Sequence, residues 1–287
     1  MFQESKLKIG PFSLKLQSDI PTVNNNLKLM YNDYTEYNEH NFVDFNIKLS
    51  TQSLLRRFIR PQADFFIDEF LPFKPLPRDQ AYAMFEWGVN YCITTKARQF
   101  LMLHAGVVEK NDKAIIMPAH PGSGKSTLTA ALCFNGFRLF SDEVCLISQK
   151  DDLVYPCTKP INLKNESIDV IDNYLDGAIF SSIATDTHKG TVALLKPPLD
   201  SVKRINEPAT PNFIIFPKYQ AGAKAKLTPI ESKATVFQLL IEHSFNYHVL
   251  GEAGFKQISK LLNNIHCYEF VYSEFEEAKT IFNELVN

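Results

Sequence analysis

Residues 119–127, Ala-His-Pro-Gly-Ser-Gly-Lys-Ser-Thr, constrain the fold of this chain more than any other segment. They match the pattern G-x-x-x-x-G-K-[ST] at every fixed position except the first, where Ala119 replaces glycine. A fully apolar stretch at 114–117 precedes the segment, and a helical pattern with Leu128 and Leu132 facing inward follows it. The segment, called the glycine loop below, is therefore predicted to join a buried strand to a helix.

The residue types in the glycine loop favour phosphate binding. Gly122 and Gly124 let the backbone turn so that successive N–H groups point into one concavity. The following helix adds the positive end of its dipole. Lys125 can reach the β- and γ-phosphates of a nucleotide, and the Ser126 hydroxyl can ligate Mg²⁺. The alternative is a glycine turn that caps an ordinary helix, but the chain has only 11 glycines, so this cluster favours phosphate binding.

We expect the whole loop to contact a nucleotide, with Mg²⁺ beside its phosphates. Ala119 keeps its N–H donor, and His120 occupies a variable position of the pattern. The predicted nucleotide-binding residues are Ala119, His120, Pro121, Gly122, Ser123, Gly124, Lys125, Ser126 and Thr127.

An acidic pair follows the loop at the start of an apolar strand. Asp142 and Glu143 lie 17 and 18 residues after Lys125. Carboxylates in this position can hold Mg²⁺ or accept a proton from an attacking hydroxyl, whereas the alternative is a solvated strand edge. Neighbouring strand residues point to opposite faces, so we expect one of the two to meet the acceptor. The shorter Asp142 is our choice for this catalytic role, and it is also the expected Mg²⁺ ligand beside Ser126.

Four further residues are weaker candidates. His104 ends the strand before a charged turn, and a lone histidine is more often structural than functional. Lys189, Lys218 and Lys233 are candidate contacts for phosphate or for the acceptor, although a solvated lysine is the default for each.

Composition excludes several classes of protein. The chain has 30 Lys+Arg against 32 Asp+Glu, a net charge of −2, which argues against a nucleic-acid binder. No apolar run approaches the roughly 18 residues of a membrane helix, and residues 1–6 lead into no apolar core, so we expect neither a membrane span nor a signal peptide.

The cysteines are odd in number and lack C-x-x-C, which favours reduced thiols in a cytoplasmic protein over disulfides or a zinc site. They are Cys92, Cys133, Cys145, Cys157 and Cys267. A homo-oligomer remains open.

Hydrophobic patterning divides the chain in two. Residues 1–76 are predicted to form a β-rich N-terminal region, and residues 77–287 the domain that carries the glycine loop. The boundary is the proline-rich segment 71–77. Apolar and polar residues alternate at 12–16 and 43–49, which predicts half-buried antiparallel strands.

Further elements follow from local patterns. The segment 23–26 is a turn candidate, and 78–94 is predicted to be a helix. Strands are predicted at 101–108 and 138–148, with a charged turn at 109–113. Later helices are predicted at 233–243, 254–263 and 273–285.

These features form one recognisable pattern. It comprises His104-Ala105-Gly106, the strand 114–117, the glycine loop, Asn135-Gly136-Phe137-Arg138-Leu139 and Ser141-Asp142-Glu143. The pattern resembles the catalytic domain of the HPr kinase/phosphorylase family. Over nearly its whole length the chain is more similar to the HPr kinase-related kinases of type A. That similarity is carried by residues 86–90, 160–168, 189–193, 197–198, 216–219 and 244–247.

The resemblance implies an α/β fold with an α+β tendency, of the phosphoenolpyruvate-carboxykinase-like P-loop kinase type. Its sheet would be mixed and largely antiparallel, and the β-rich region would precede it. It also implies ATP, Mg²⁺ and phosphorylation of a serine-type hydroxyl. By the same resemblance, Lys125 holds phosphates, Ser126 binds Mg²⁺, Asp142 or Glu143 accepts the proton, and His104 faces the transferred phosphate.

Three positions depart from the family pattern. Glu143 replaces the second aspartate of an Asp-Asp pair. Thr187 stands where the family has a metal-binding glutamate. Lys233 or Ala234 falls where the family has a catalytic arginine, so reverse phosphorylase chemistry is not implied.

The sequence therefore predicts an ATP-dependent kinase whose acceptor is a serine-type hydroxyl on a protein or peptide. A free small molecule such as serine is the second choice of acceptor. An ATP- or GTP-binding switch or assembly module without transfer activity is the main rival, because two acidic positions differ from the family. A carboxykinase-like metabolic enzyme is the third possibility.

Overall fold

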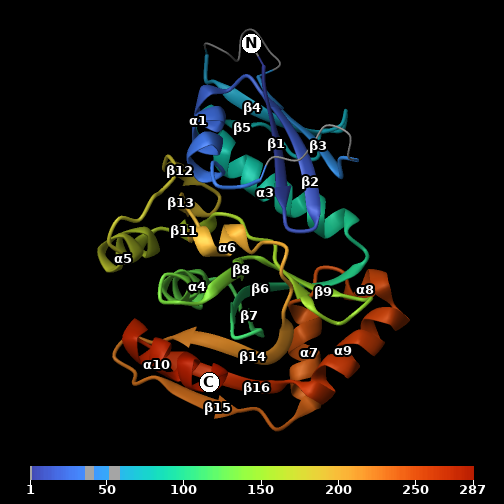
Figure 1. Cartoon of the computed structure of the whole chain (residues 1–287). Coiled ribbons are helices and arrows are strands. Elements are labelled where there is room, and N and C mark those ends of the chain that lie inside the picture. The colour runs from blue at the N-terminus through green and yellow to red at the C-terminus, as the bar shows by residue number, and fades with distance from the viewer. Residues whose placement is uncertain (1, 36–41, 52–58) are drawn as a thin grey trace.

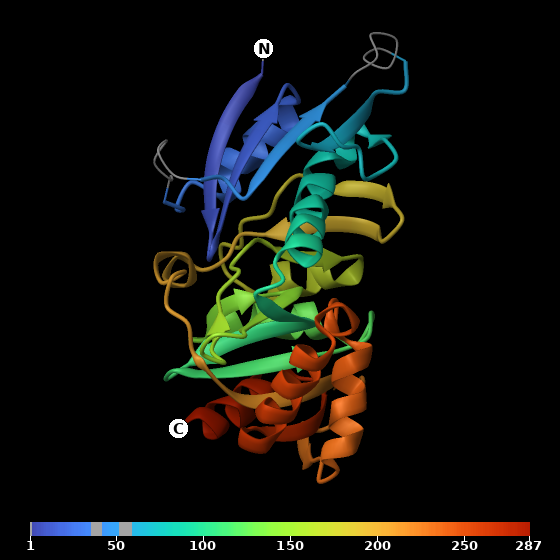
Figure 2. The ribbon, with the colours of Figure 1, turned by 90° about the vertical axis from the view of Figure 1, so that its right-hand side faces the viewer.

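The structure is a computed structural model that describes residues 2–35, 42–51 and 59–287. It is a mixed α/β structure in which the described strands form three sheets, stacked from the N-terminal to the C-terminal end of the molecule (Figure 1). Figure 2 shows the same stack from the side, with the first strands at one end and the last helices at the other. The expectation of an α/β chain with mixed sheets is confirmed.

The N-terminal sheet has the strand order β1-β2-β3-β4-β5. Its strands are β1 (Gln3–Ile9), β2 (Phe12–Ser18), β3 (Phe45–Ser50), β4 (Gln62–Ile67) and β5 (Leu76–Pro77). The strands predicted at 12–16 and 43–49 are present, and each has an antiparallel neighbour as predicted, because β2 pairs with β1 and β3 pairs with β4. In addition, β2 and β3 pair with each other in parallel. Parallel neighbours need a crossover connection, and the helix α1 (Pro21–Met30) provides part of it.

The turn predicted at 23–26 lies inside α1, so that prediction was wrong. Proline occupies the first turn of the helix, where its missing N–H costs nothing. The buried side chains of Val23, Leu27 and Met30 then recur every three or four residues along one face. This apolar spacing outweighs the three asparagines that suggested a turn.

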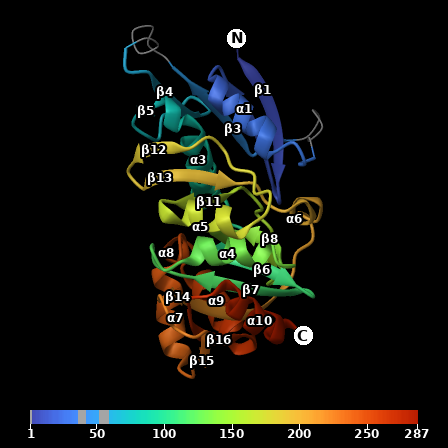
Figure 3. The same cartoon turned by 90° about the vertical axis from the view of Figure 1, so that its left-hand side faces the viewer.

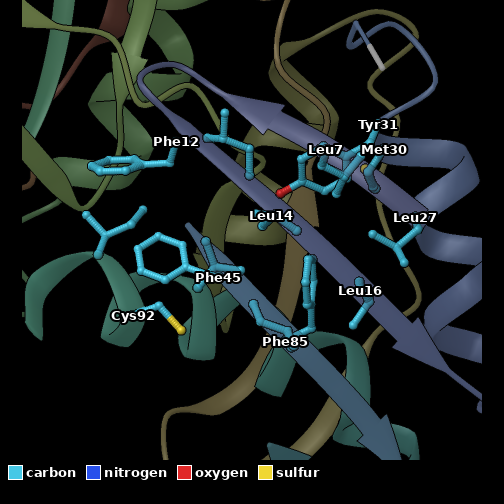
Figure 4. Close-up of a cluster of buried hydrophobic side chains, with 14 of the residues drawn as sticks. Leu7, Phe12, Leu14, Leu16, Leu27, Met30, Tyr31, Phe45, Phe85 and Cys92 are labelled. Atoms are coloured by element: carbon cyan, nitrogen blue, oxygen red, sulfur yellow. The ribbon is translucent and has the colours of Figure 1, made fainter. Parts of the chain in front are cut away.

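Helix α3 (Ala81–Lys96) follows the short turn η1 (Arg78–Gln80) and confirms the helix predicted at 78–94. It packs against the N-terminal sheet, where an added Cβ on Gly88 would lie 2.1 Å from the Phe65 ring. Figure 4 shows Phe85 and Cys92 of α3 facing Leu14 and Phe45 of the sheet in one apolar core. The helix is therefore fixed along its length by side chains of the N-terminal region.

The central sheet is mixed. Its order is β10-β9-β6-β7-β14-β16-β15, and β8 also pairs with β6. β6 and β7 form an antiparallel hairpin, whereas β14 runs parallel to both β7 and β16. The strands are β6 (Phe100–Lys110), β7 (Lys113–Pro118), β8 (Arg138–Ser141), β9 (Val144–Ser148), β10 (Val154–Tyr155), β14 (Thr210–Tyr219), β15 (Lys226–Pro229) and β16 (His266–Tyr272).

Helices cover both faces of the central sheet. Ile115 and Met117 of β7 belong to a core shared with α4 (Lys125–Cys133), α5 (Glu166–Tyr174) and α10 (Phe275–Val286). Ile116, between them in sequence, belongs to the opposite core. That core is shared with α7 (Lys233–Glu242), the one-turn helix α8 (Tyr247–Leu250) and α9 (Glu252–Asn264). The three late helices predicted from the sequence are α7, α9 and α10, with ends that differ by at most two residues.

A three-stranded sheet lies between the other two sheets (Figure 3). Its order is β11 (Ile161–Lys164), β13 (Gly190–Leu195) and β12 (Ala184–Thr187). The short helix α6 (Leu199–Lys203) follows β13. The middle sheet brings β11 and the β12–β13 hairpin to the end of α3, where the candidate site lies.

Two sequence expectations concern whole-chain properties. All five cysteines carry free thiols, as their spacing predicts. Within the described ranges, the structure contains no helix that is both long and apolar enough to cross a membrane.

Candidate functional site

The glycine loop connects β7 to α4, as predicted. Gly122 and Gly124 adopt φ values of +86° and +85°, a backbone region that favours glycine. The ends of two parallel strands hold the loop: the Tyr219 N–H donates to the Ser123 carbonyl at 2.9 Å, and the Tyr272 hydroxyl donates to the Gly124 carbonyl at 3.0 Å. The loop is thus fixed at the start of α4, with the helix N-terminus directed into it.

Lys125 joins the loop to the residues on its far side. Its side chain is buried, and its ammonium donates to the Asp142 carbonyl at 2.8 Å and lies 3.3 Å from His104 Nε2. Burial lowers the pKa of Lys125, although Asp142 and Glu143 act in the opposite direction. The glycine at position 106 lets α4 pack closely against β6, because a Cβ there would lie 2.4 Å from the Thr129 hydroxyl of α4.

His104 is neutral at pH 7 in this setting. Burial and the neighbouring Lys125 charge lower its pKa from 6.5 to about 4. A lysine ammonium has no lone pair to offer, so Nε2 of His104 must be the acceptor in their contact. The histidine therefore orients the Lys125 ammonium without adding positive charge to the site.

The acidic pair lies at a bend rather than inside a strand. The strand predicted over 138–148 is interrupted at Asp142 and Glu143, which separate β8 from β9, so that prediction was wrong. The Ser141 hydroxyl accepts the N–H groups of Glu143 at 3.2 Å and Val144 at 2.9 Å, and this local capping lets the chain turn. The bend places the acidic pair beside Lys125 and Ser126, at the start of α4.

The two carboxylates have different partners. Asp142 is 5% exposed, and its Oδ2 accepts the Asn162 N–H at 3.0 Å. Glu143 accepts hydrogen bonds from the side-chain amides of Asn90 and Asn162. Burial raises the pKa of Asp142 against the effect of Lys125. Burial also acts to raise the pKa of Glu143, but nearby lysines, Lys189 foremost, outweigh it and lower that pKa.

The donor set beside the loop fits a magnesium ion bound together with phosphates. Ser126 lies close enough to the Asp142 carboxylate to act toward lowering its pKa. Asp142 Oδ1 is buried and has no hydrogen-bond partner. Mg²⁺ is commonly held by one or two such oxygens, with phosphates and waters completing the octahedron. Among the described residues, no three His, Cys, Asp or Glu side chains gather into a metal site, so substrate phosphates would have to supply further ligands.

An open pocket of about 260 Å³ adjoins these groups. His104 and Glu143 line it, whereas Asp142 is not among its lining residues. Aromatic side chains form its walls, and the Lys189 ammonium lies 4.9 Å above the Trp87 ring. The remaining lining residues include Trp87, Asn90, Tyr91 and Phe245. The pocket is large enough for a side chain and its immediate neighbours, and Glu143 is one of its lining residues.

The structure brings together most of the residues selected from the sequence. Lys125, Ser126, Asp142, Glu143, His104 and Lys189 surround the loop and the pocket. Lys218 is exposed and precedes Tyr219, which contacts the loop. Lys233 lies elsewhere: its ammonium donates to Asn263, and it lines a separate groove.

Sequence reasoning assigned no role to several residues that the site contains. Asn90 and Trp87 lie within 86–90, Asn162 within 160–168 and Phe245 within 244–247. These segments contribute to the resemblance described above, and that resemblance was the signal in the sequence that could have identified these residues. Nothing in their local patterns indicated that α3 and β11 would meet the acidic bend.

No protein-family model matches this chain, and a search of curated proteins found no significant match. The functional assignment therefore depends on the geometry of the site and on the sequence pattern.

Proposed function

We propose that the chain is an ATP-dependent kinase of the HPr kinase type, with the corresponding P-loop kinase fold, that phosphorylates a serine-type hydroxyl on a protein or peptide. One observation carries the proposal: the Lys125 ammonium contacts both the Asp142 carbonyl and His104. This contact joins the glycine loop, the acidic bend and the histidine beside one open pocket. A phosphate donor and a hydroxyl acceptor would meet there.

The loop and Lys125 would hold the nucleotide phosphates. Backbone N–H groups of the loop and the α4 dipole provide positive potential, and Lys125 would turn from its protein partners to the β- and γ-phosphates. Ser126 and Asp142 would hold Mg²⁺, which neutralises phosphate charge when bound. Because this chemistry needs positioning more than covalent participation, a preformed site of this kind suits it.

Glu143 is the better-placed proton acceptor. It lines the open pocket and Asp142 does not, which reverses the ranking favoured by the sequence. The acceptor oxygen would attack the γ-phosphorus while its proton passes to the Glu143 carboxylate, and ADP would leave with the bond electrons. The lysines around Glu143 keep its pKa low, so it is ionised and ready to accept at neutral pH.

The pocket supports a protein or peptide acceptor over a free small molecule. Its walls combine the rings of Trp87, Tyr91 and Phe245 with the charged groups of Lys189 and Glu143. A serine side chain presented on a longer chain can enter while neighbouring residues contact these walls. Free serine would leave much of the about 260 Å³ unfilled.

Transfer of label from γ-labelled ATP tests the proposal. The purified chain, Mg²⁺ and a peptide extract of host cells are incubated, and labelled products are identified by mass spectrometry. We expect a serine-containing product with the wild type and none with Lys125→Ala. Lys233→Ala is the matched control, because Lys233 lies outside the site. If the wild-type protein binds ATP but yields no labelled product, the transfer activity is refuted.

The second candidate is a nucleotide-binding switch without transfer. Thr187, at the position of the family's metal-binding glutamate, favours it, because the Thr187 hydroxyl donates to the Gly190 carbonyl and closes the β12–β13 hairpin. A switch would bind Mg-ATP in a Lys125-dependent manner and turn it over slowly. Asp142→Asn and Glu143→Gln would leave the ATP turnover of a switch unchanged, whereas they would lower the activity of a kinase.

A further inference from the structure

A second, smaller cavity lies beneath the acidic bend. Its volume is about 10 Å³, which is room for one water molecule or one metal ion. Asn90 of α3, Asp142 and Glu143 of the bend, and Asn162 of β11 line it. Ser126 does not line it, whereas Asp142 belongs both to this cavity and to the magnesium position proposed beside the glycine loop.

Three oxygen atoms on the lining residues have no hydrogen-bond partner: Oδ1 of Asn90, Oδ1 of Asp142 and Oδ1 of Asn162. Asp142 and Asn162 are each only 5% exposed, so water outside the protein does not satisfy them. A buried polar group without a partner costs free energy of about 1–3 kcal/mol. All three oxygens belong to residues that line one small cavity, and an occupant of that cavity could satisfy them.

The orientation of both amides is fixed by Glu143. The Nδ2 groups of Asn90 and Asn162 donate to its two carboxylate oxygens. Rotating either amide would place a carbonyl oxygen against the carboxylate. The two asparagine carbonyls are consequently the atoms left without partners, together with one carboxylate oxygen of Asp142.

A cation matches these oxygens better than water does. A water molecule has two protons and can serve two of the three acceptors, whereas a cation can bind all three. The charged side chains that line the cavity are Glu86, Asp142, Glu143 and Lys159, that is, three carboxylates against one ammonium. Lys159 already donates to the carbonyl and to the carboxylate of Glu86.

We propose that this cavity holds a divalent cation in the absence of nucleotide. Carboxylate and amide oxygens are hard ligands that suit Mg²⁺, Mn²⁺ and Ca²⁺. The ion ties α3 and β11 to the acidic bend, because its ligands come from all three. It thereby fixes the asparagine amides that hold Glu143, and with them the orientation of that carboxylate toward the open pocket.

Manganese titration of the full chain tests the site without nucleotide or acceptor. The metal-free protein is prepared with a chelator, and free Mn²⁺ is followed by its paramagnetic resonance signal. We expect one Mn²⁺ per chain in the wild type, displaced by excess Mg²⁺. Asn162→Ala should weaken binding at least about tenfold, and Asn162→Asp should retain it, because a carboxylate oxygen replaces the amide carbonyl.

Two control variants distinguish this cavity from the glycine loop and from a single buried oxygen elsewhere. Asn212 also has a buried Oδ1 without a partner but lines a different groove, so Asn212→Ala should bind Mn²⁺ like the wild type. Ser126→Ala should also retain nucleotide-free binding. If Asn162→Ala does not fold, Asn90→Ala on α3 provides the same test, because alanine favours helix.

Two outcomes would overturn the cation. One is uptake of Mn²⁺ by the wild type only after nucleotide is added, and the other is wild-type affinity in both Asn90→Ala and Asn162→Ala. Either result would assign the cavity to water. The measurement uses no ATP and no acceptor, so its outcome is independent of whether the chain is a kinase.

Discussion

The Lys125 ammonium donates a hydrogen bond of 2.8 Å to the backbone carbonyl of Asp142. This contact links the first residue of α4 to the bend between β8 and β9. It holds the acidic residues within reach of the glycine loop before any ligand binds. Phosphates would compete with this carbonyl for the ammonium, so binding of a nucleotide and release of the bend are coupled in the proposed kinase.

Lys125→Ala should weaken ATP binding at least about tenfold, because a hydrogen bond to a charged group contributes about 1.5–3 kcal/mol. Isothermal titration in the presence of Mg²⁺ measures the effect. Lys233→Ala, whose side chain lies in a separate groove, should bind ATP like the wild type. Equal affinities of wild type and Lys125→Ala would remove the assignment of the loop to phosphate binding.

Glu143→Gln should slow phosphoryl transfer by about 10²–10⁴-fold, as loss of a positioned proton acceptor does. Its affinity for Mg-ATP should change little, because Glu143 contacts asparagines rather than the loop. Asp142→Asn should instead raise the Mg²⁺ concentration needed for half-maximal activity, since Asp142 lies beside Ser126. Single-turnover rates at saturating Mg-ATP, with Mg²⁺ titrations, separate the two effects. The reverse pattern would restore Asp142 as the base favoured by the sequence.

The sequence predicted the parts of this fold that depend on local patterns. The glycine loop, its flanking strand and helix, and the late helices follow from periodicity and residue type, and the structure contains them. The bend at Asp142 was missed because Val144 to Ser148 continue the apolar pattern of Arg138 to Ser141, so no local signal marks a break. Only the Ser141 hydroxyl, which caps two N–H groups, distinguishes the bend from a strand.

The remaining parts of the site depend on contacts between distant segments. Asn90 and Glu143 are 53 residues apart, and Asn162 reaches Glu143 from 19 residues away. Neither pairing follows from spacing in one sequence, because it requires the position of α3 over the middle sheet. The parallel pairing of β2 with β3 was missed for a similar reason, since it depends on α1 as part of a crossover.

Gly124→Ala should destabilise the protein more than Gly122→Ala. Both residues have positive φ, so each substitution carries a backbone cost of about 1–2 kcal/mol. A Cβ on Gly122 meets open space, whereas one on Gly124 would lie 2.5 Å from the Tyr272 hydroxyl and 2.9 Å from Tyr219 Cβ. Urea unfolding of both variants measures the difference.

The clash at Gly124 can be isolated with Tyr272→Phe. This change removes the hydroxyl that an alanine at position 124 would meet, so the double variant should be more stable than the sum of the single effects predicts. Part of the cost should remain, because Tyr219 Cβ is unchanged. Simple additivity would show that the loop moves away from Tyr272 when a side chain is added.

His104 should make the protein less stable in mild acid. Its native pKa of about 4 lies below the ordinary value of 6.5, with burial as the main cause and Lys125 as the next. Between these two values the unfolded chain binds a proton that the native state excludes, so stability falls as pH decreases from 6.5 toward 4. Above pH 6.5 His104 is neutral in both the native and the unfolded state, so it causes no further change of stability with pH.

His104→Gln should therefore lose less stability than the wild type between pH 7.5 and pH 5. Urea midpoints of both proteins at the two pH values give the comparison. His188 and His243 also have lowered pKa values, but both proteins retain them, so their contributions cancel in the difference. If the variant loses as much stability as the wild type over this interval, His104 is charged or solvated in the native state. Its proposed role as a neutral partner of Lys125 would then be wrong.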